Sequence, residues 1–296
     1  MRKTALITGG NRGLGLVAAR KLAERGFDLV ITARAPAQGE SAAAAIRGRV
    51  PAASVEVLPL DLASFESIRS FPARLGATTR PLHALVLNAG LMTQDRQPRF
   101  TAEGFELTLG TNHVGHFLLT HLLLPRLRAA APARIVVVAS QMHRAGVGKG
   151  AGPDFDYGNL RAEKSFDPVV AYRNSKLANL WFTFELARRL EGSGVTVNAV
   201  CPGFVPATIA DRMPGLFQRL VFRHVLPLLS FTRTPEQGGE NTARTAADPA
   251  LAGLSGRLFA DLKELDASDD ARDPAQAKRL WDESCHWCGI EQFGEA

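Results

Sequence analysis

Thr4-Ala-Leu-Ile-Thr-Gly-Gly-Asn-Arg-Gly-Leu-Gly15 joins a short apolar run to a glycine-rich turn with Gly9, Gly13 and Gly15, and this stretch decides the fold. The run Thr4–Thr8 is predicted to form a buried strand, and a helix follows from about residue 14. Glycines at a strand–helix junction allow a tight turn and let backbone N–H groups approach a pyrophosphate at the helix N-terminus. We therefore expect a phosphate-binding turn, made by Gly9, Asn11, Arg12, Gly13, Leu14 and Gly15.

Beyond this turn, short β-rich runs alternate with longer helical patterns along the chain. Strands are predicted at Thr4–Thr8, Asp28–Ala33, Ser54–Leu60, Leu82–Leu87, Arg134–Ala139, Val195–Val200 and Gly256–Phe259. Helices are predicted near 14–26, 38–48, 64–76, 101–129, 168–192 and 234–247. Repeated β-then-α units with wholly apolar strands indicate an α/β fold with a doubly wound, parallel, seven-stranded sheet, the Rossmann fold. No linker or repeat divides the chain, so residues 1–296 are expected to form one domain.

Two segments depart from the alternation, at 141–167 and 203–233. Both follow the carboxyl end of a predicted strand, which is where ligands bind in open α/β sheets. The second carries an apolar stretch, Leu216–Phe231, interrupted by Arg219 and Arg223. We expect residues 204–233 to be a helical substrate lid inserted after the sixth strand, in preference to ordinary packed structure or a membrane-surface patch.

The second predicted strand ends without the acidic residue that would bind the ribose of NAD. Arg34 stands there instead, and Arg12 lies in the glycine turn, so two guanidinium groups are available for a 2′-phosphate. This pattern predicts NADP(H) as the cofactor. Short polar signals at the ends of two further strands predict contacts to the adenine and the ribose, at Asp61, Leu62, Asn88, Ala89 and Gly90.

Tyr172 and Lys176 are four residues apart on a predicted helix and therefore share one face. A phenol has an ordinary pKa near 10, and a neighbouring ammonium favours the phenolate. Such a phenol beside a dinucleotide site suits an enzyme that moves a proton while a nicotinamide moves a hydride.

Composition excludes several other classes of protein. The chain has 296 residues, 46% of them hydrophobic, a formal charge of +6 and a sequence pI of about 9.6. The arginines are dispersed, so nucleic acid is not an expected partner. No apolar run has the length of a membrane span, and the first strand starts too early for a signal peptide, so the cytoplasm is the expected location. No metal is expected, because Cys285 and Cys288 lack a second ligand pair and His113, His116 and His121 do not share one face.

These motifs together resemble the short-chain dehydrogenase/reductase family over nearly the whole chain. They occur in the family's order: the Thr-Gly-x-x-x-Gly-x-Gly turn, Asn88-Ala-Gly90, Thr111-Asn-His-Val-Gly, Ser140, Tyr172-x-x-x-Lys176 and Pro202-Gly203. Thr111-Asn-His-Val-Gly-His-Phe117 and Ala171-Tyr-Arg-Asn-Ser-Lys-Leu-Ala-Asn179 are similar to the branch of retinol dehydrogenases, protochlorophyllide reductase and bacterial ketoreductases.

The resemblance implies a role for each matching residue. Tyr172 would be the general acid or base, and Lys176 would lower its pKa and hold the nicotinamide ribose. Ser140 would donate a hydrogen bond to the substrate oxygen, and Asn112 would hold a water that connects Lys176 to solvent. Pro202, Gly203, Val205 and Thr208 would contact the cofactor. The family's usual threonine, which contacts the nicotinamide carboxamide, is replaced by Ala207 here. Either Pro206 re-aims the loop so that Thr208, one residue later, makes this contact, or the contact is lost.

The resulting hypothesis is an NADPH-dependent oxidoreductase that interconverts a carbonyl and an alcohol on a bulky apolar substrate. Reduction of a carbon–carbon double bond is the first alternative, because the same tyrosine and lysine can serve it. A non-catalytic NADP-binding scaffold is the second, and the presence of all four catalytic-type residues argues against it. A membrane contact is not favoured, and the protein is expected to be a monomer or a homo-oligomer.

Overall fold

The computed structural model describes residues 2–76, 81–144, 155–210, 215–261 and 263–295. Within these ranges one sheet has the strand order β3-β2-β1-β4-β5-β6-β7-β8. The strands are β1 Lys3–Ile7, β2 Phe27–Ala33, β3 Val55–Pro59, β4 Leu82–Leu87, β5 Ala133–Val138, β6 Val195–Cys201, β7 Arg257–Ala260 and β8 Lys263–Glu264. Seven run parallel, as predicted, and β8 adds a short antiparallel edge that the sequence analysis missed.

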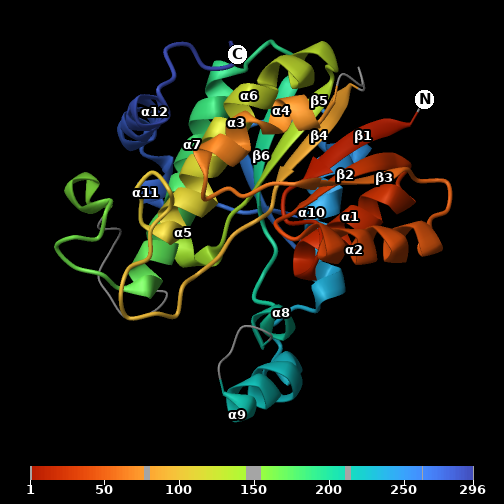
Figure 1. The fold of residues 1–296 in the computed structure, drawn as a ribbon, viewed down its shortest axis with the longest axis horizontal. Helices are drawn as coiled ribbons and strands as arrows, with labels where there is room; N and C mark the ends of the chain where they lie inside the picture. Colours follow the sequence, from red (N-terminus) through yellow and green to blue (C-terminus); the bar gives the residue numbers. More distant parts are fainter. Residues whose placement is uncertain (1, 77–80, 145–154, 211–214, 262, 296) are drawn as a thin grey trace.

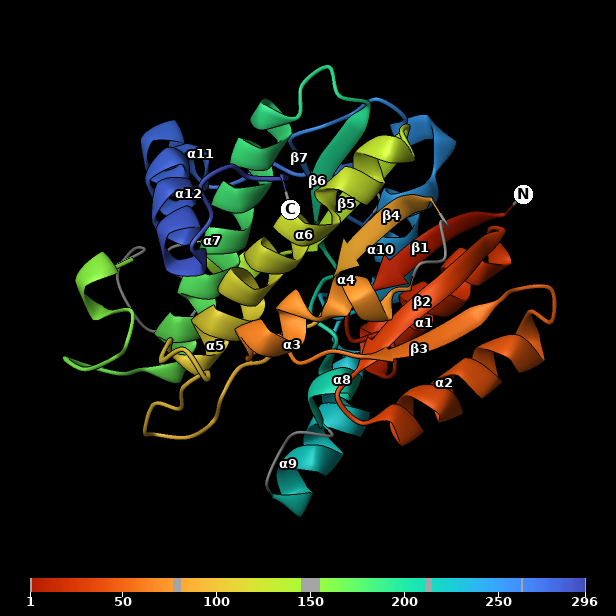
Figure 2. The same cartoon turned by 45° about the horizontal axis from the view of Figure 1, so that its top comes forward.

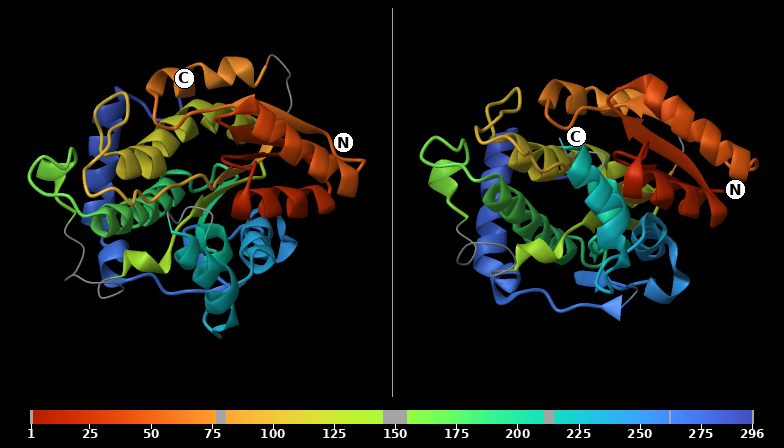
Figure 3. Two further views of the ribbon diagram at one scale, coloured as in Figure 1. Left: turned by 60° about the horizontal axis from the view of Figure 1, so that its bottom comes forward. Right: turned by 90° about the horizontal axis from the view of Figure 1, so that it is seen from below.

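Helices cover both faces of this sheet (Figures 1 and 3). One face carries α1 Gly13–Glu24, α2 Pro36–Arg49 and α10 Pro235–Ala247. The other carries α3 Phe65–Arg69, α4 Phe71–Arg74, α6 Gly115–Ala129 and α7 Pro168–Arg189, with α12 Pro274–Cys288 packed on the outside of α7. Successive side chains along a strand point to opposite faces of the sheet, so each strand contributes to the helix layer on either side. Leu85 and Leu87 of β4 join the cluster under α6, while Ala84 and Val86 join the cluster under α1 and α10.

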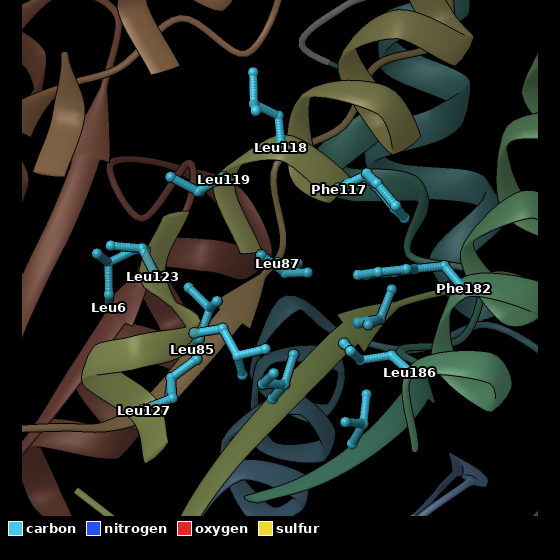
Figure 4. Close-up of a cluster of buried hydrophobic side chains, with 14 of the residues drawn as sticks. Leu6, Leu85, Leu87, Phe117, Leu118, Leu119, Leu123, Leu127, Phe182 and Leu186 are labelled. Carbon is cyan, nitrogen blue, oxygen red and sulfur yellow. The ribbon is translucent and has the colours of Figure 1, made fainter. Parts of the chain in front are cut away.

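The larger core cluster lies between the sheet and helices α6 and α7 (Figure 4). Phe117 of α6 and Phe182 of α7 are both buried there, with ring centroids 5.5 Å apart. Each fully buried side chain of this size contributes roughly 1.5–3 kcal/mol, so this cluster fixes the position of α7, and with it Tyr172 and Lys176. Among the described helices, none combines the length and the apolar character that crossing a bilayer requires.

Two predicted helices differ from those observed. The helix expected at 101–129 begins later, with α5 at Leu107–Leu109, a π-helical segment at Gly110–Val114 and then α6. The preceding residues form a turn, because the Thr101 hydroxyl accepts the N–H groups of Glu103 and Phe105 and competes with helix formation. The helix expected at 64–76 is divided into α3 and α4 at Ser70, just before Pro72 removes a backbone donor.

The carboxyl edge of the sheet is where β1 and β4, which are neighbours, connect to helices on opposite faces. A crevice at such a switch point is the usual ligand site of doubly wound folds. After β6 the chain forms α8 Pro206–Ala210 and α9 Leu216–Leu220, which project from this edge (Figures 1 and 2). Residues 145–154 of the predicted loop at 141–167 and residues 211–214 of the predicted lid lie outside the described residues.

Candidate active site

The glycine turn after β1 has the geometry of an anion cradle. Gly9 and Gly13 have φ angles of +64° and +55°, which favour glycine. A Cβ on Gly15 would lie 2.3 Å from the Gly9 carbonyl oxygen, so a side chain would force the turn and α1 apart. Arg12 occupies the N-cap of α1 with no side-chain capping bond, which leaves the first N–H groups of the helix to a ligand. These residues fit the pyrophosphate of a dinucleotide.

Thr8 joins this turn to the end of β4. Its hydroxyl oxygen accepts the N–H groups of Asn88, at 2.9 Å, and of Ala89, at 3.0 Å. The Asn88 side-chain amide donates back to the Thr8 carbonyl at 2.8 Å. Asn88 and Ala89, predicted as cofactor contacts, therefore also fix the two strand ends to each other. Thr8 belongs to the turn motif but was not predicted as a site residue, because its role depends on the pairing of β1 with β4.

The two arginines expected at the cofactor phosphate are both exposed near this turn. Within the described part of the chain, neither Arg12 nor Arg34 has a hydrogen-bonding or ion-pair partner among the other side chains. Asp61 follows β3, and its carboxylate accepts the Ala63 N–H at 3.0 Å, which shapes the turn before α3. The carbonyl oxygen of Leu62 abuts Gly115, where a Cβ would lie 2.3 Å from it.

Lys176 is buried at the centre of the site, 3% exposed. Its ammonium donates to the Val138 carbonyl oxygen at 2.9 Å and lies 5.6 Å from the centroid of the Tyr172 ring. The Asn179 amide reaches the same carbonyl at 3.3 Å. Burial lowers the pKa of Lys176 to about 8, an effect that Cys201 partly opposes. The structure thus brings the predicted tyrosine and lysine together at the end of β5.

Asn112 is held in the π-helical segment before α6 and is fully buried. Its side chain accepts the Leu91 N–H at 2.8 Å, donates to the Leu91 carbonyl at 2.9 Å and donates to the Ser175 hydroxyl at 3.0 Å. A Cβ on Gly90 would lie 3.2 Å from Asn112 Oδ1 and 3.7 Å from Lys176 Nζ. Asn112 therefore orders the loop after β4 beside Lys176, and its expected contact with a water stays a prediction.

Ser140 lies two residues after the end of β5 and is half-buried. Its hydroxyl oxygen accepts the Met142 N–H at 3.2 Å, which leaves the O–H proton free to point toward a substrate. The neighbouring His143 was not predicted as part of the site. Its Nδ1 lies 2.6 Å from the Ser140 carbonyl oxygen and its Nε2 accepts the Ser268 N–H at 3.3 Å, so it fixes the backbone that presents Ser140.

The loop after β6 closes the site from the other side. Gly203 follows Pro202 with a φ of +85°, and Val205 is buried. The Thr208 hydroxyl donates to the Val205 carbonyl at 2.9 Å, and its methyl group lies 3.8 Å from the position of a Cβ on Gly13. Thr208 thus lies against the glycine turn, and its oxygen keeps lone pairs for an amide donor. Its contact with the cofactor stays a prediction.

No group of three or more histidine, cysteine or acidic side chains in the described ranges is arranged to hold a metal ion. Burial raises the pKa of Cys285 to about 11 and that of Cys288 to about 12, so both are thiols at neutral pH.

A glycine cradle at a switch point, beside a tyrosine and a buried lysine, defines a dinucleotide-dependent oxidoreductase. The family model described as short chain dehydrogenase matches residues 3–151. Human retinol dehydrogenase 12 is 42% identical over 288 residues, which cover 97% of this chain and 87% of that protein. The chain therefore belongs to the short-chain dehydrogenase family and is similar to its retinol dehydrogenases.

Solved structures agree with this assignment. A Mycobacterium paratuberculosis protein superposes with a TM-score of 0.74 and 31% identity, covering 98% of this chain and 94% of that one. Pseudomonas aeruginosa RhlG, solved with NADP, superposes with a TM-score of 0.66 and 25% identity, covering 87% and 94%. Enzymes of this family use NAD(P)(H) to interconvert carbonyls and alcohols on small molecules.

Proposed function

We propose that this oxidoreductase uses NADPH to reduce a carbonyl on a bulky apolar substrate, or NADP to oxidise the corresponding alcohol. The single observation that carries the proposal is the placement of buried Lys176 next to Tyr172, at the sheet edge that also holds the glycine turn. When bound there, the nicotinamide supplies or accepts the hydride, and the protein supplies the proton and the orientation.

Lys176, Tyr172 and Ser140 each have a separate role in this reaction. With a pKa of about 8, Lys176 is mostly an ammonium at pH 7, and its charge favours the phenolate form of Tyr172 after a proton has been given to the substrate oxygen. The Ser140 hydroxyl donates a hydrogen bond to that oxygen, and this bond strengthens as negative charge develops. The contact between the Ser140 carbonyl oxygen and His143 holds the backbone that presents the Ser140 hydroxyl to the substrate.

Preference for NADPH is supported by charge at the end of β2. Arg34 follows the strand, Arg12 lies in the turn, and both are exposed to a ligand. A 2′-phosphate would form charge-assisted hydrogen bonds with these guanidinium groups, which a ribose hydroxyl would not match. RhlG, a structural relative, was solved with NADP.

An apolar substrate is supported by the segment after β6. Leu216, Phe217 and Leu228 are 75%, 78% and 83% exposed, which is unusual for such large apolar side chains. The ends of the segment are tied together, since Phe204 stacks on Phe231 with centroids 6.1 Å apart and Arg233 forms a two-bond ion pair with Asp261. A segment held together at its base, with several large apolar side chains exposed, suits a lid that closes over an apolar ligand.

The test is a substrate panel with each cofactor. The purified enzyme is given all-trans-retinal, a bulky aromatic ketone or propanal, with NADPH or NADH, and loss of absorbance at the nicotinamide band is followed. The proposal predicts the highest kcat/KM with NADPH and a bulky apolar carbonyl. Preference for NADH would refute the cofactor assignment, and equal kcat/KM for propanal and the bulky substrates would refute the substrate class.

A further inference from the structure

His116 connects the cofactor-binding turn with the helix that holds Asn112. Its imidazole is 2% exposed. Nε2 lies 2.9 Å from the Thr8 hydroxyl oxygen, and Nδ1 lies 3.0 Å from the Asn112 carbonyl oxygen. The Thr8 hydroxyl is the one that binds the N–H groups of Asn88 and Ala89. One ring thus spans the ends of β1 and β4 on one side and the π-helical segment on the other.

We propose that His116 is a positioning residue, which fastens Thr8 to the backbone of Asn112 and so sets the cofactor-binding turn against Lys176. The kcat measurement that tests this inference rests on the function proposed above. The measurement of NADPH affinity needs no substrate and does not depend on that function.

The hydrogen bonds assign the tautomer of the ring. A carbonyl oxygen only accepts, so Nδ1 carries the proton and donates to Asn112. The two lone pairs of the Thr8 oxygen are engaged by Asn88 and Ala89, so its proton faces two acceptors, His116 Nε2 at 2.9 Å and the Val86 carbonyl oxygen at 3.3 Å. The shorter contact favours donation to Nε2. Burial, opposed by the hydrogen bond to the Asn112 carbonyl and aided by the charge of Lys176, lowers the pKa of His116 to about 4. The ring is therefore neutral at pH 7, which allows Nδ1 to donate and Nε2 to accept a hydrogen bond.

From Asn112 the connection continues to both catalytic-type residues. The Asn112 amide donates to the Ser175 hydroxyl, which donates at 2.7 Å to the Tyr172 carbonyl oxygen. Asn112 Oδ1 and Lys176 Nζ both lie against Gly90. A shift of the Asn112 backbone would thus move the surroundings of Tyr172 and Lys176 together. Displacements of about 1 Å at a reacting centre can cost on the order of 100-fold in rate.

His113 provides a matched control three residues away. It is 1% exposed and equally buried, but its Nε2 lies 2.9 Å from the Ser284 hydroxyl on α12, and its ring packs against Phe117 and Phe182. Its imidazole therefore belongs to the core between α6, α7 and α12. Substitution of either histidine removes a buried ring from the same stretch of chain, and only His116 contacts the cofactor-binding turn.

The experiment compares His116→Phe with His113→Phe in three measurements: melting temperature, NADPH dissociation constant by nucleotide fluorescence, and kcat on a carbonyl substrate. We expect both variants to lose thermal stability. We expect His116→Phe to raise the dissociation constant and to lower kcat by about tenfold or more each, while His113→Phe keeps both within twofold. Equal changes in the two variants would overturn the proposal.

Two conservative variants separate the two ends of the connection and keep the test open if His116→Phe does not fold. In His116→Asn the amide N–H stands close to the former Nδ1 position and can bond to Asn112, but it does not reach Thr8. In His116→Gln the longer side chain reaches Thr8 instead. We expect His116→Asn to keep kcat within about threefold with weakened NADPH binding, and His116→Gln to do the reverse. Identical effects in both would overturn the positioning role.

If wild-type protein binds NADPH but reduces no carbonyl, the proposed function fails while the affinity comparison still decides the role of His116.

Discussion

Replacing Lys176 by methionine should stabilise the cofactor-free protein at neutral pH while removing its activity. Burial lowers the pKa of Lys176 from 10.5 to about 8, which corresponds to roughly 3 kcal/mol against the charged form. The lost hydrogen bond to Val138 offsets about 1 kcal/mol of this, and the Asn179 amide still satisfies that carbonyl. The expected gain is about 2 kcal/mol, or roughly 5 °C in melting temperature for a protein of this size.

The pH dependence makes this prediction specific. Because the folded pKa lies below the unfolded one, the unfolded chain binds more protons between pH 8 and 10.5, and wild-type stability gains from this group as pH rises through that range. The advantage of Lys176→Met should therefore be full at pH 7 and fade toward pH 10.5. Urea denaturation of both proteins at pH 7 and pH 10 measures it. A variant less stable than wild type at pH 7, or an advantage that does not change with pH, would refute the reasoning.

Three further predictions follow from the same geometry. Arg34→Asp should shift preference from NADPH toward NADH by about 100-fold in kcat/KM, because a carboxylate replaces a charge-assisted donor, and unchanged preference would remove Arg34 from the phosphate site. Burial lowers the pKa values of His113 and His116 to about 3 and 4, so the free energy of unfolding should fall as pH drops below 6.5. In urea denaturation, His113→Leu should lose about 2 kcal/mol less than wild type between pH 7 and pH 5. Phe217→Ser and Leu228→Ser, at exposed positions, should raise KM for bulky substrates several-fold with unchanged melting temperature. Leu254→Ser, at the opposite edge of the sheet, should leave KM unchanged. Equal KM values in all three variants would refute a lid.

The parts of the fold that follow from local pattern could be predicted from the sequence. The seven parallel strands lie within two residues of their predicted bounds, because each is a short apolar run next to a turn signal. The strand β8 was missed because two residues, Lys263 and Glu264, carry no such pattern and pair only through tertiary contact with β7. The start of the helix at Leu107 depended on the Thr101 hydroxyl bonding to its own backbone, which periodicity does not express.

The candidate site divides in the same way. Tyr172 and Lys176 were predictable, because a spacing of four on a helix places side chains together without knowledge of the tertiary fold. Thr8, His116 and His143 were not, because each acts through a partner distant in sequence. The partner is Asn88 for Thr8, Thr8 for His116 and Ser268 for His143. In the sequence, His116 was considered only as a metal ligand and set aside, because it does not share one face with His113 and His121. The structure shows that its ring is buried and has two polar contacts that the sequence does not reveal.

The central claim is that Tyr172 delivers the proton while NADPH delivers the hydride. The most direct measurement combines NADPH deuterated at the nicotinamide C4 position with wild-type enzyme and Tyr172→Phe. The account predicts that wild type places deuterium on the former carbonyl carbon, and that Tyr172→Phe loses about 1,000-fold or more in kcat while binding NADPH within about threefold of wild type. A Tyr172→Phe enzyme with near-normal kcat, or a wild-type product without deuterium at that carbon, would contradict it.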